Sequence, residues 1–239
     1  MMYKNIIVKL LIFVCVIIFL ISISILIKDF IAYKENNDAT EQLIQNVIEV
    51  DETEEKNHIN WQELNEINSD IIAWIEIENT NINYPILRDS NSYYLNHSYD
   101  KKYNKNGSIF TTNTNPFIDV ETVIYGHNMK NGTMFSELGK YLKKDFLDTH
   151  NCIKIYTPNG DYEGTIISAY SIGIDIENNT IKSLDFNERI EYYKRASKYT
   201  VENIDNINKI VKLSTCSYLN AKTSPTDQRY YIIASIIPI

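Results

Sequence analysis

Two apolar segments of the sequence lead into residues that could carry out nucleophilic chemistry. Residues 210–215 precede Cys216, and residues 123–125 precede Gly126 and His127. A cysteine reacts as its thiolate, and an imidazole can take up and return the thiol proton near neutral pH. Both residues follow strand-like runs, so we expect them at the rim of a β structure, where a fold can present a catalytic pair.

A third candidate, Arg229, begins the strand-like run that follows the polar loop 217–228. If the strands on either side of this loop pair as a hairpin, Cys216 and Arg229 lie side by side. A guanidinium there would favour the thiolate and would offer fixed N–H donors to an oxyanion. The three residue types together predict attack on a carbonyl carbon, with protonated His127 as the acid for a leaving amine.

The remaining cysteines and histidines fit simpler interpretations. Cys152 begins a strand and fits a buried small hydrophobe, although a Cys152–Cys216 disulfide in an oxidising compartment stays open. The other histidines are predicted in a tether, in a loop and at a helix end, respectively His58, His97 and His150. The sequence contains no C-x-x-C or H-E-x-x-H motif, so we predict no metal site. His127 precedes Cys216, unlike the order in papain-like proteases, and the caspase motif Q-A-C-x-G is absent.

These residues must be positioned by a fold with many short strands. The chain has 239 residues, 44% of them hydrophobic, which suffices for one domain with a substantial core. Its formal net charge of −8 argues against nucleic-acid binding. Strands are predicted at 71–77, 82–86, 107–111, 122–125, 152–156, 162–171, 210–214 and 230–237, and helices at 134–142 and 186–199. We therefore predict a mainly β fold, a closed or nearly closed barrel with helical insertions.

The N-terminal segment is predicted to anchor the chain in a membrane. Residues 10–27 are apolar except for two serines, and Lys4 and Lys9 precede the run. The positive-inside rule then leaves the N-terminus in the cytoplasm and the remainder on the extracellular face of the cell membrane, as a single-pass protein. A cleaved signal peptide is the alternative, but no small-x-small site follows Ile27.

We divide the chain into a cytoplasmic tail (1–5), a transmembrane anchor (6–28), an extracytoplasmic tether (29–60) and a catalytic domain (61–239). Within the tether, Ile44, Val47 and Ile48 predict one short amphipathic helix, and residues 61–67 predict another helix that packs on the core.

Several motifs resemble those of one known family. Leu213-Ser214-Thr215-Cys216, with an arginine on the next strand, resembles the active-site strand of sortases. Tyr125-Gly126-His127-Asn128-Met129, followed by Gly132-Thr133-Met134-Phe135, is similar to the histidine motif of class B sortases. Similar segments of that class are found at 82–86, 91–95 and 107–110, and the stretch 186–208 resembles its extra helix. The resemblance covers residues 61–239.

The resemblance implies an eight-stranded sortase-type β-barrel that acts as a cysteine transpeptidase without a cofactor. It implies that Cys216 attacks a threonine carbonyl in the C-terminal sorting signal of a surface protein. It also implies that an amine of a lipid-linked peptidoglycan precursor resolves the thioacyl enzyme. His127 and Arg229 would complete the catalytic set. By position in the motifs, the substrate groove would be lined by Asn91, Leu95 and Ser214. Thr111 and Thr112 stand where class B members often carry an acidic residue, so an acidic partner for His127 is not predicted.

Two other functions stay open. A sortase that polymerises pilin would use a lysine side chain as the amine, but such enzymes often have a lid and a second, C-terminal membrane helix, and neither is found in this sequence. A non-catalytic, membrane-tethered binding module would have no reason to retain the cysteine, histidine and arginine together.

Overall fold

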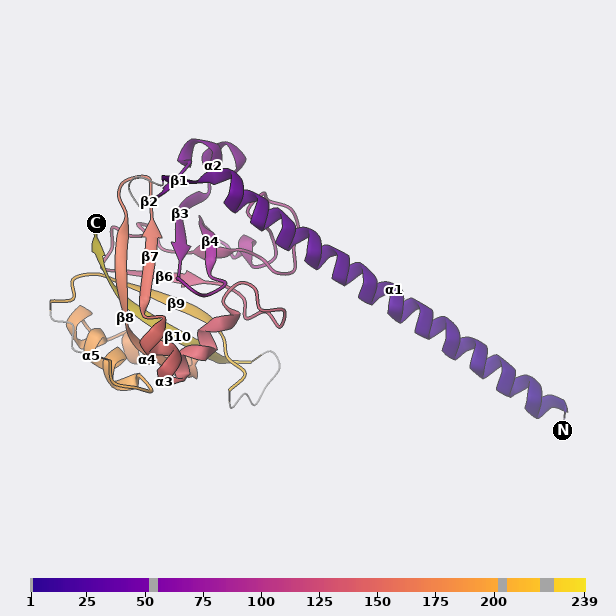
Figure 1. Ribbon diagram of the computed structural model, residues 1–239. Coiled ribbons are helices and arrows are strands. Elements are labelled where there is room, and N and C mark those ends of the chain that lie inside the picture. Colours follow the sequence, from indigo (N-terminus) through magenta and orange to yellow (C-terminus); the bar gives the residue numbers. More distant parts are fainter. Residues whose placement is uncertain (1, 52–55, 202–205, 220–225) are drawn as a thin grey trace. The chain divides into compact units, whose positions relative to one another are not determined.

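The computed structural model describes residues 2–51, 56–201, 206–219 and 226–239 (Figure 1). The chain forms two compact units, residues 1–58 and 59–239. The fold of each unit is given separately below.

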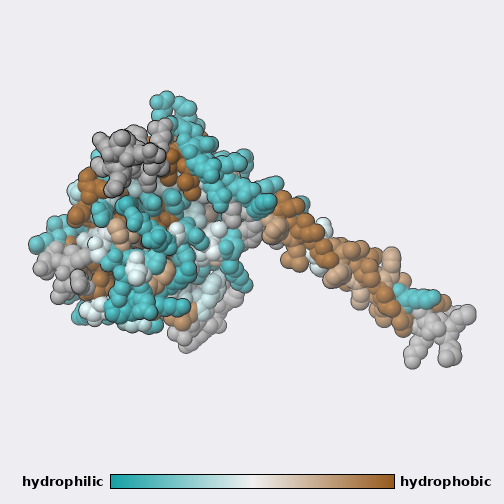
Figure 2. Space-filling model, in the orientation of Figure 1, coloured by the Kyte–Doolittle hydropathy of each residue, from teal (hydrophilic) through white to brown (hydrophobic). Residues whose placement is uncertain are grey.

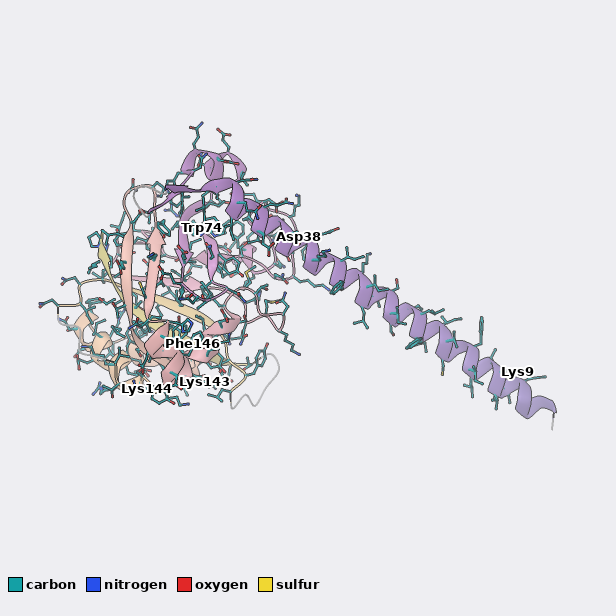
Figure 3. The ribbon with its side chains drawn as sticks, in the orientation of Figure 1. Lys9, Asp38, Trp74, Lys143, Lys144 and Phe146 are labelled. Carbon is teal, nitrogen blue, oxygen red and sulfur yellow. The ribbon has the colours of Figure 1, made fainter. Side chains whose placement is uncertain are left out.

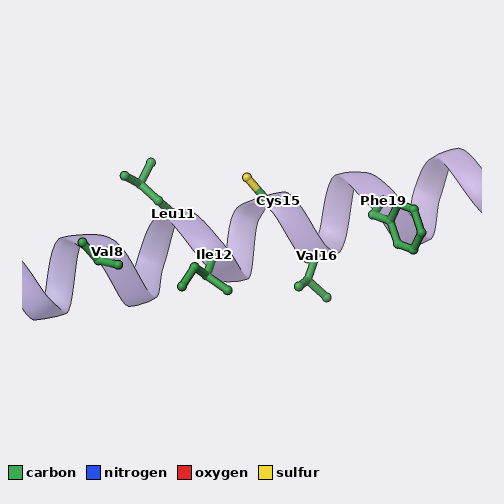
Figure 4. Close-up of a pocket in the computed structure, with 6 residues that line it drawn as sticks. All are labelled: Val8, Leu11, Ile12, Cys15, Val16 and Phe19. Atoms are coloured by element: carbon green, nitrogen blue, oxygen red, sulfur yellow. The ribbon is translucent and has the colours of Figure 1, made fainter.

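The first unit is dominated by the long helix α1 (Met2–Val47). Its segment Ile6–Lys28 has a mean hydropathy of 3.4 and contains no buried residue, and by length and composition it could cross a membrane. Figure 2 shows the apolar residues gathered along this part of the helix. Val8, Leu11, Ile12, Cys15, Val16 and Phe19 lie along one stretch of it (Figure 4). The prediction of a separate short helix around Ile44–Ile48 is wrong, because α1 continues without a break to Val47. The chain then forms β1 (Ile48–Asp51), which pairs with β2 (Lys56–Ile59).

The second unit is built on a closed barrel of eight strands, as predicted. The strands are β3 (Ile71–Glu76), β4 (Asn83–Arg88), β5 (Ile109–Thr111), β6 (Glu121–Tyr125), β7 (Cys152–Tyr156), β8 (Tyr162–Gly173), β9 (Ile210–Cys216) and β10 (Gln228–Pro238). Their order around the barrel is β10-β8-β7-β3-β4-β5-β6-β9, and β9 also pairs with β10 to close it. The β4–β5 and β6–β9 pairs are parallel, and the other pairs are antiparallel.

Helices lie between the strands, and they differ from the prediction in three places. The segment predicted as a helix at 134–142 is a 3₁₀ helix, η2 (Ser136–Leu142), followed by α3 (Lys144–Thr149). Helix α4 (Ile174–Ile181) was not predicted, because its Asp- and Asn-rich sequence has low helix propensity and its tertiary contacts decide its structure. Helix α5 (Phe186–Ala196) begins with a capping box between Asp185 and Glu188. It ends before residue 199 because Ser197 leaves the helical conformation and its hydroxyl donates to the Tyr199 carbonyl. The remaining elements are α2 (Trp61–Ile67) and the 3₁₀ helix η1 (Tyr93–Leu95).

Among the described residues of this unit, buried side chains form a larger and a smaller cluster around the strands. The larger fills the barrel, and on β9 it includes Val211 and Leu213. The smaller lies on the outside of the barrel beside α5, and it includes Ile210 of β9 and Tyr231 of β10. Trp74 of β3 and Phe146 of α3 can be located in Figure 3. Because side chains alternate along a strand, those of Ile210 and Lys212 lie on the outer face of β9, and those of Val211 and Leu213 lie in the barrel interior.

Candidate active site

Three strands bring Cys216, His127 and Arg229 to one end of the barrel. In the antiparallel β9–β10 pair, Cys216 lies directly opposite Arg229. In the parallel β6–β9 pair, Tyr125 lies opposite Ser214. Because both parallel strands run toward the same end, His127 and Cys216, each two residues farther on, leave the barrel side by side. The hairpin geometry expected from the sequence is thus present.

Arg229 is half-buried, and its guanidinium is held by backbone carbonyls. Its Nη1 donates to the carbonyl oxygens of Thr226 and Gln228, both at 2.9 Å. The Gln228 carbonyl also accepts from the backbone N–H of Ser217, the residue after Cys216. The guanidinium is therefore tied to the same few peptide groups that adjoin the cysteine. With two nitrogens left for other acceptors, it can bind an oxyanion or a substrate carbonyl.

Tight packing fixes the backbone at His127. A Cβ on Gly126 would lie 2.4 Å from the side chain of Ile109 and 2.8 Å from that of Phe135, so any larger residue before the histidine must displace these two buried side chains. The His127 carbonyl accepts from the backbone N–H of Phe135 at 2.9 Å. The glycine in the motif thus reflects a close approach of the chain to the barrel core.

The imidazole of His127 is oriented by a backbone carbonyl. Its Nε2 lies 2.7 Å from the Leu95 carbonyl oxygen. A carbonyl can only accept, so this contact requires the proton on Nε2 and leaves the lone pair of the neutral ring on Nδ1. Leu95 was predicted to line the substrate groove. The contact between its carbonyl and His127 could not be predicted from the sequence, because every residue type carries a backbone carbonyl.

The loop that carries Leu95 is itself braced. Asp89, only 4% exposed, accepts from the backbone N–H groups of Asn91 at 2.9 Å and Tyr94 at 2.8 Å. Behind the loop, Gly107 has φ +59°, and a Cβ there would lie 2.6 Å from the carbonyl oxygens of both Tyr94 and Leu95. Ser108 donates its N–H to the Tyr94 carbonyl at 2.9 Å. These contacts hold η1, and with it the carbonyl that faces His127.

Two side chains that the sequence analysis did not assign tie the histidine loop to the cysteine strand. Asn128 donates through Nδ2 to the Cys216 carbonyl at 2.7 Å. Thr215 donates through its hydroxyl to the Gly126 carbonyl at 2.7 Å. The signal for Asn128 was its place directly after the histidine in the motif, where a polar side chain next to a rim residue is available for such a bond.

The predicted groove residues differ in accessibility. Asn91 is exposed, and Leu95 is 43% exposed. Ser214 is only 5% exposed, and its carbonyl accepts from the Gly126 N–H. Asn91 and Leu95 belong to the loop that faces His127, whereas Ser214 lies within β9, two residues before Cys216.

Cys152, His97 and His150 make contacts other than those of this constellation. Cys152, at the start of β7, contacts the Glu163 carboxylate, and burial together with that carboxylate raises the pKa of its thiol. All three cysteines are free thiols. His97 stacks on Tyr93, and His150 at the end of α3 stacks on Phe146. Among the described residues, no group of three or more His, Cys, Asp or Glu side chains could hold a metal ion.

Comparison with known proteins gives concordant results. The sortase domain family profile matches residues 75–237. Sortase B of Listeria monocytogenes is 40% identical over 162 residues, which span 65% of this chain and 66% of that protein, just under two thirds of its length.

Solved structures agree with this match. The structure of sortase B from B. anthracis in complex with AAEK1 is 27% identical and has a TM-score of 0.70, covering 88% of this chain and 100% of that one. A Staphylococcus aureus sortase B–substrate complex is 30% identical with a TM-score of 0.64, covering 75% of this chain and 85% of that one.

Proposed function

This chain belongs to the sortase family and resembles its class B members, and we propose that it is a membrane-anchored cysteine transpeptidase that attaches surface proteins to the cell wall. Its first substrate is a C-terminal sorting signal, cleaved after a threonine. Its second substrate is the amine of a lipid-linked peptidoglycan precursor. The apolar segment Ile6–Lys28 is the anchor that keeps the catalytic domain at the extracellular face of the membrane.

In the acylation half-reaction, the Cys216 thiolate attacks the threonine carbonyl carbon, and the carbonyl oxygen becomes an oxyanion. Arg229 stabilises this negative charge. When the intermediate collapses, the C–N bond of the scissile peptide breaks and protonated His127 gives its proton to the leaving amine. The product of this half-reaction is a thioester between Cys216 and the threonine.

In the second half-reaction, the acceptor amine attacks the thioester carbonyl, and neutral His127 takes the proton that the amine loses. The thiolate of Cys216 is the leaving group, and a new amide joins the surface protein to the precursor. Proton and electron pair are thereby returned to the enzyme, so neither a cofactor nor an oxidant is needed. The exposed Asn91 and Leu95 would contact the sorting signal, and the Leu95 carbonyl oxygen lies 2.7 Å from His127 Nε2.

The observation that supports this proposal most directly is the strand register. Cys216 lies opposite Arg229 in β9–β10, and the parallel β6–β9 pair delivers His127 to the same end. The hydrogen bond from Asn128 to the Cys216 carbonyl adds a direct link between the two strand ends.

A peptide-library screen with the full-length protein in detergent micelles tests the proposal. We expect cleavage after a threonine and, with an added amino-peptide, a ligated product detected by mass spectrometry. Cys216→Ala should abolish both products. Cys152→Ala is the matched control and should retain nearly full activity, because that thiol lies beside a carboxylate at the start of another strand.

Three results would count against the proposal. Absence of any cleaved peptide would favour a non-catalytic binding module. Loss of activity in Cys152→Ala, with activity retained in Cys216→Ala, would show that Cys152 and not Cys216 is the nucleophile. Ligation only to lysine side chains of a pilin-like protein would indicate the polymerising reaction instead.

A further inference from the structure

A buried ion pair lies outside the candidate active site and takes no part in the proposed reaction. Lys212 of β9 and Glu177 of α4 form a salt bridge, and their side chains are 4% and 0% exposed. Burial of two charges is costly unless each is paired and fully hydrogen-bonded. A pair of this kind between the outer face of β9 and α4 therefore needs a reason.

The carboxylate of Glu177 accepts hydrogen bonds from three side chains. Tyr170 of β8 donates to Oε1 at 2.7 Å, and Tyr192 of α5 donates to Oε2 at 2.8 Å. Lys212 donates to Oε1 as well. Burial and the nearby carboxylate raise the pKa of both tyrosines, which keeps them in the protonated, donating form. Glu177 thus joins α4 to β8, β9 and α5 through three bonds.

The ammonium group of Lys212 is enclosed by aromatic rings. It lies 4.8 Å from the ring centroid of Tyr193 and 4.4 Å from that of Tyr231, and the Tyr193 hydroxyl is 3.5 Å away. Aromatic faces are among the few apolar surfaces that stabilise a desolvated cation. Lys212 is therefore fixed in position by Glu177 and by the strand next to its own, β10.

Helix α4 is connected in turn to the segment that holds Arg229. The N–H of Ile174, its first residue, donates to the Asp227 carbonyl at 2.9 Å. Asp227 lies between Thr226 and Gln228, whose carbonyls accept from the guanidinium. A shift of α4 would move this short segment, and the guanidinium with it.

We infer that Glu177 and Lys212 are positioning residues, which hold α4 on the barrel so that residues 226–228 keep the Arg229 guanidinium beside Cys216. This inference deepens the proposed function and rests on it for the role of Arg229. Strand β9 carries both the lysine of the ion pair and the proposed nucleophile: Lys212 and Cys216 are four residues apart and lie on the same face of the strand.

The test compares two buried carboxylates of one neighbourhood. Glu177→Gln removes the charge with little change of shape and leaves Lys212 without its counter-charge. Glu121→Gln is the control. Glu121 is also buried, it binds Tyr193 at 2.9 Å and Arg189 at 3.0 Å, and it lies at the start of β6, the end of the strand away from His127. Both changes should lower the urea midpoint of unfolding.

The measured quantity is the rate at which iodoacetamide alkylates Cys216 at pH 7 in the full-length protein in detergent micelles. Mass spectrometry of the cysteine peptides separates Cys216 from Cys15 and Cys152. We expect Glu177→Gln to slow alkylation of Cys216 roughly tenfold, because the thiolate is the form that reacts and a displaced guanidinium no longer stabilises its negative charge. Glu121→Gln should change the rate less than about twofold.

A double-mutant cycle shows whether the effect passes through Arg229. Once Arg229 is replaced by alanine, Glu177→Gln should have less than about a twofold further effect, because coupled residues are not additive. If Glu177→Gln does not fold, Tyr192→Phe removes one donor to the same carboxylate and should slow alkylation in the same direction.

Three results would overturn the inference. In the first, a folded Glu177→Gln, or Tyr192→Phe in its place, is alkylated at Cys216 as fast as wild type. In the others, Glu177→Gln slows alkylation equally with and without Arg229, or Glu121→Gln slows it as much as Glu177→Gln does. Alkylation needs no peptide substrate, so the two measurements are independent. A failure of peptide cleavage would refute the proposed function but would not determine the outcome of the alkylation test.

Discussion

Replacement of Gly107 by alanine should impair catalysis through the backbone alone. Gly107 has φ +59°, and an added Cβ would lie 2.6 Å from the Leu95 carbonyl oxygen and 2.9 Å from its carbon. Comfortable contacts of carbon lie near ~3.5 Å, so the Leu95 peptide must shift by about 0.6–0.9 Å. The bond between His127 Nε2 and that carbonyl is 2.7 Å long. A shift of this size would take the carbonyl oxygen out of hydrogen-bonding geometry with Nε2, whether it lengthens the contact or misaligns it.

The expected loss follows from the role of that bond. Without it the imidazole is free to rotate and to exchange tautomers, and a misplacement of about 1 Å at a catalytic group costs roughly a hundredfold in rate. We therefore expect kcat/KM of Gly107→Ala, measured with a quenched fluorescent peptide selected in the library screen, to fall about a hundredfold. The alanine in a left-handed conformation should also cost about 1–2 kcal/mol of stability.

Gly160→Ala separates the two effects. Gly160 lies in the turn between β7 and β8 with φ +135°, and a Cβ there would meet no atom within 4 Å. This variant has backbone strain without the clash, so its urea midpoint should fall while kcat/KM stays near normal. If Gly107→Ala folds and turns over within about threefold of wild type, the Leu95 carbonyl does not orient His127.

Three further predictions concern the charge, the membrane and the pH. Arg229→Ala should lose about a hundred- to a thousandfold in turnover, and Arg229→Lys should recover only a minor part, since lysine lacks the paired N–H donors of a guanidinium. Replacement of the exposed Arg195 by alanine is the control. Near-normal activity of both Arg229 variants would remove Arg229 from the mechanism. Protease added to intact protoplasts should digest residues 61–239, and full protection of that domain would refute the orientation. The hydroxyl of Tyr94, more than any other group, lowers the pKa of Asp70 below 3.8, with Lys101 assisting. The ionised Asp70 therefore adds stability that is fully present above its unfolded-state pKa and is lost as the pH falls through the lower folded-state pKa. Asp70→Asn should accordingly flatten the decline of the urea midpoint of unfolding below about pH 4. An unchanged decline would refute this contribution.

The barrel could be predicted from the sequence because its signal is repeated eight times. Each strand is a short apolar or alternating run, and the Asn-Gly turns punctuate several of them. The meeting of Cys216 and Arg229 was also predictable, since a hairpin places the end of one strand opposite the start of the next. This argument needs only the order of the chain, not the path of the rest of the barrel.

The features that escaped prediction depend on contacts that a single sequence does not display. Helix α4 has weak intrinsic propensity, and the bonds of Glu177 to β8, β9 and α5 hold it in place. The partner of His127 is a backbone carbonyl, which no residue type announces. A lysine in the middle of a strand, such as Lys212, ordinarily indicates a solvated face, and here α4 and α5 cover it.

The buried charge on β9 also bears on why the catalytic strand pairs in one register. Side chains alternate along a strand, so a slip of one residue would exchange the faces of β9. Lys212 would then enter the barrel interior among residues such as Ile124 and Ile232, with no acceptor for its charge, while Leu213 would face Glu177. Desolvation of an unpaired ammonium is among the largest penalties in a protein core. An alanine at 212 would lack this penalty. The Lys212–Glu177 pair thus opposes the one displacement that would carry Cys216 to the wrong side of the sheet and away from His127.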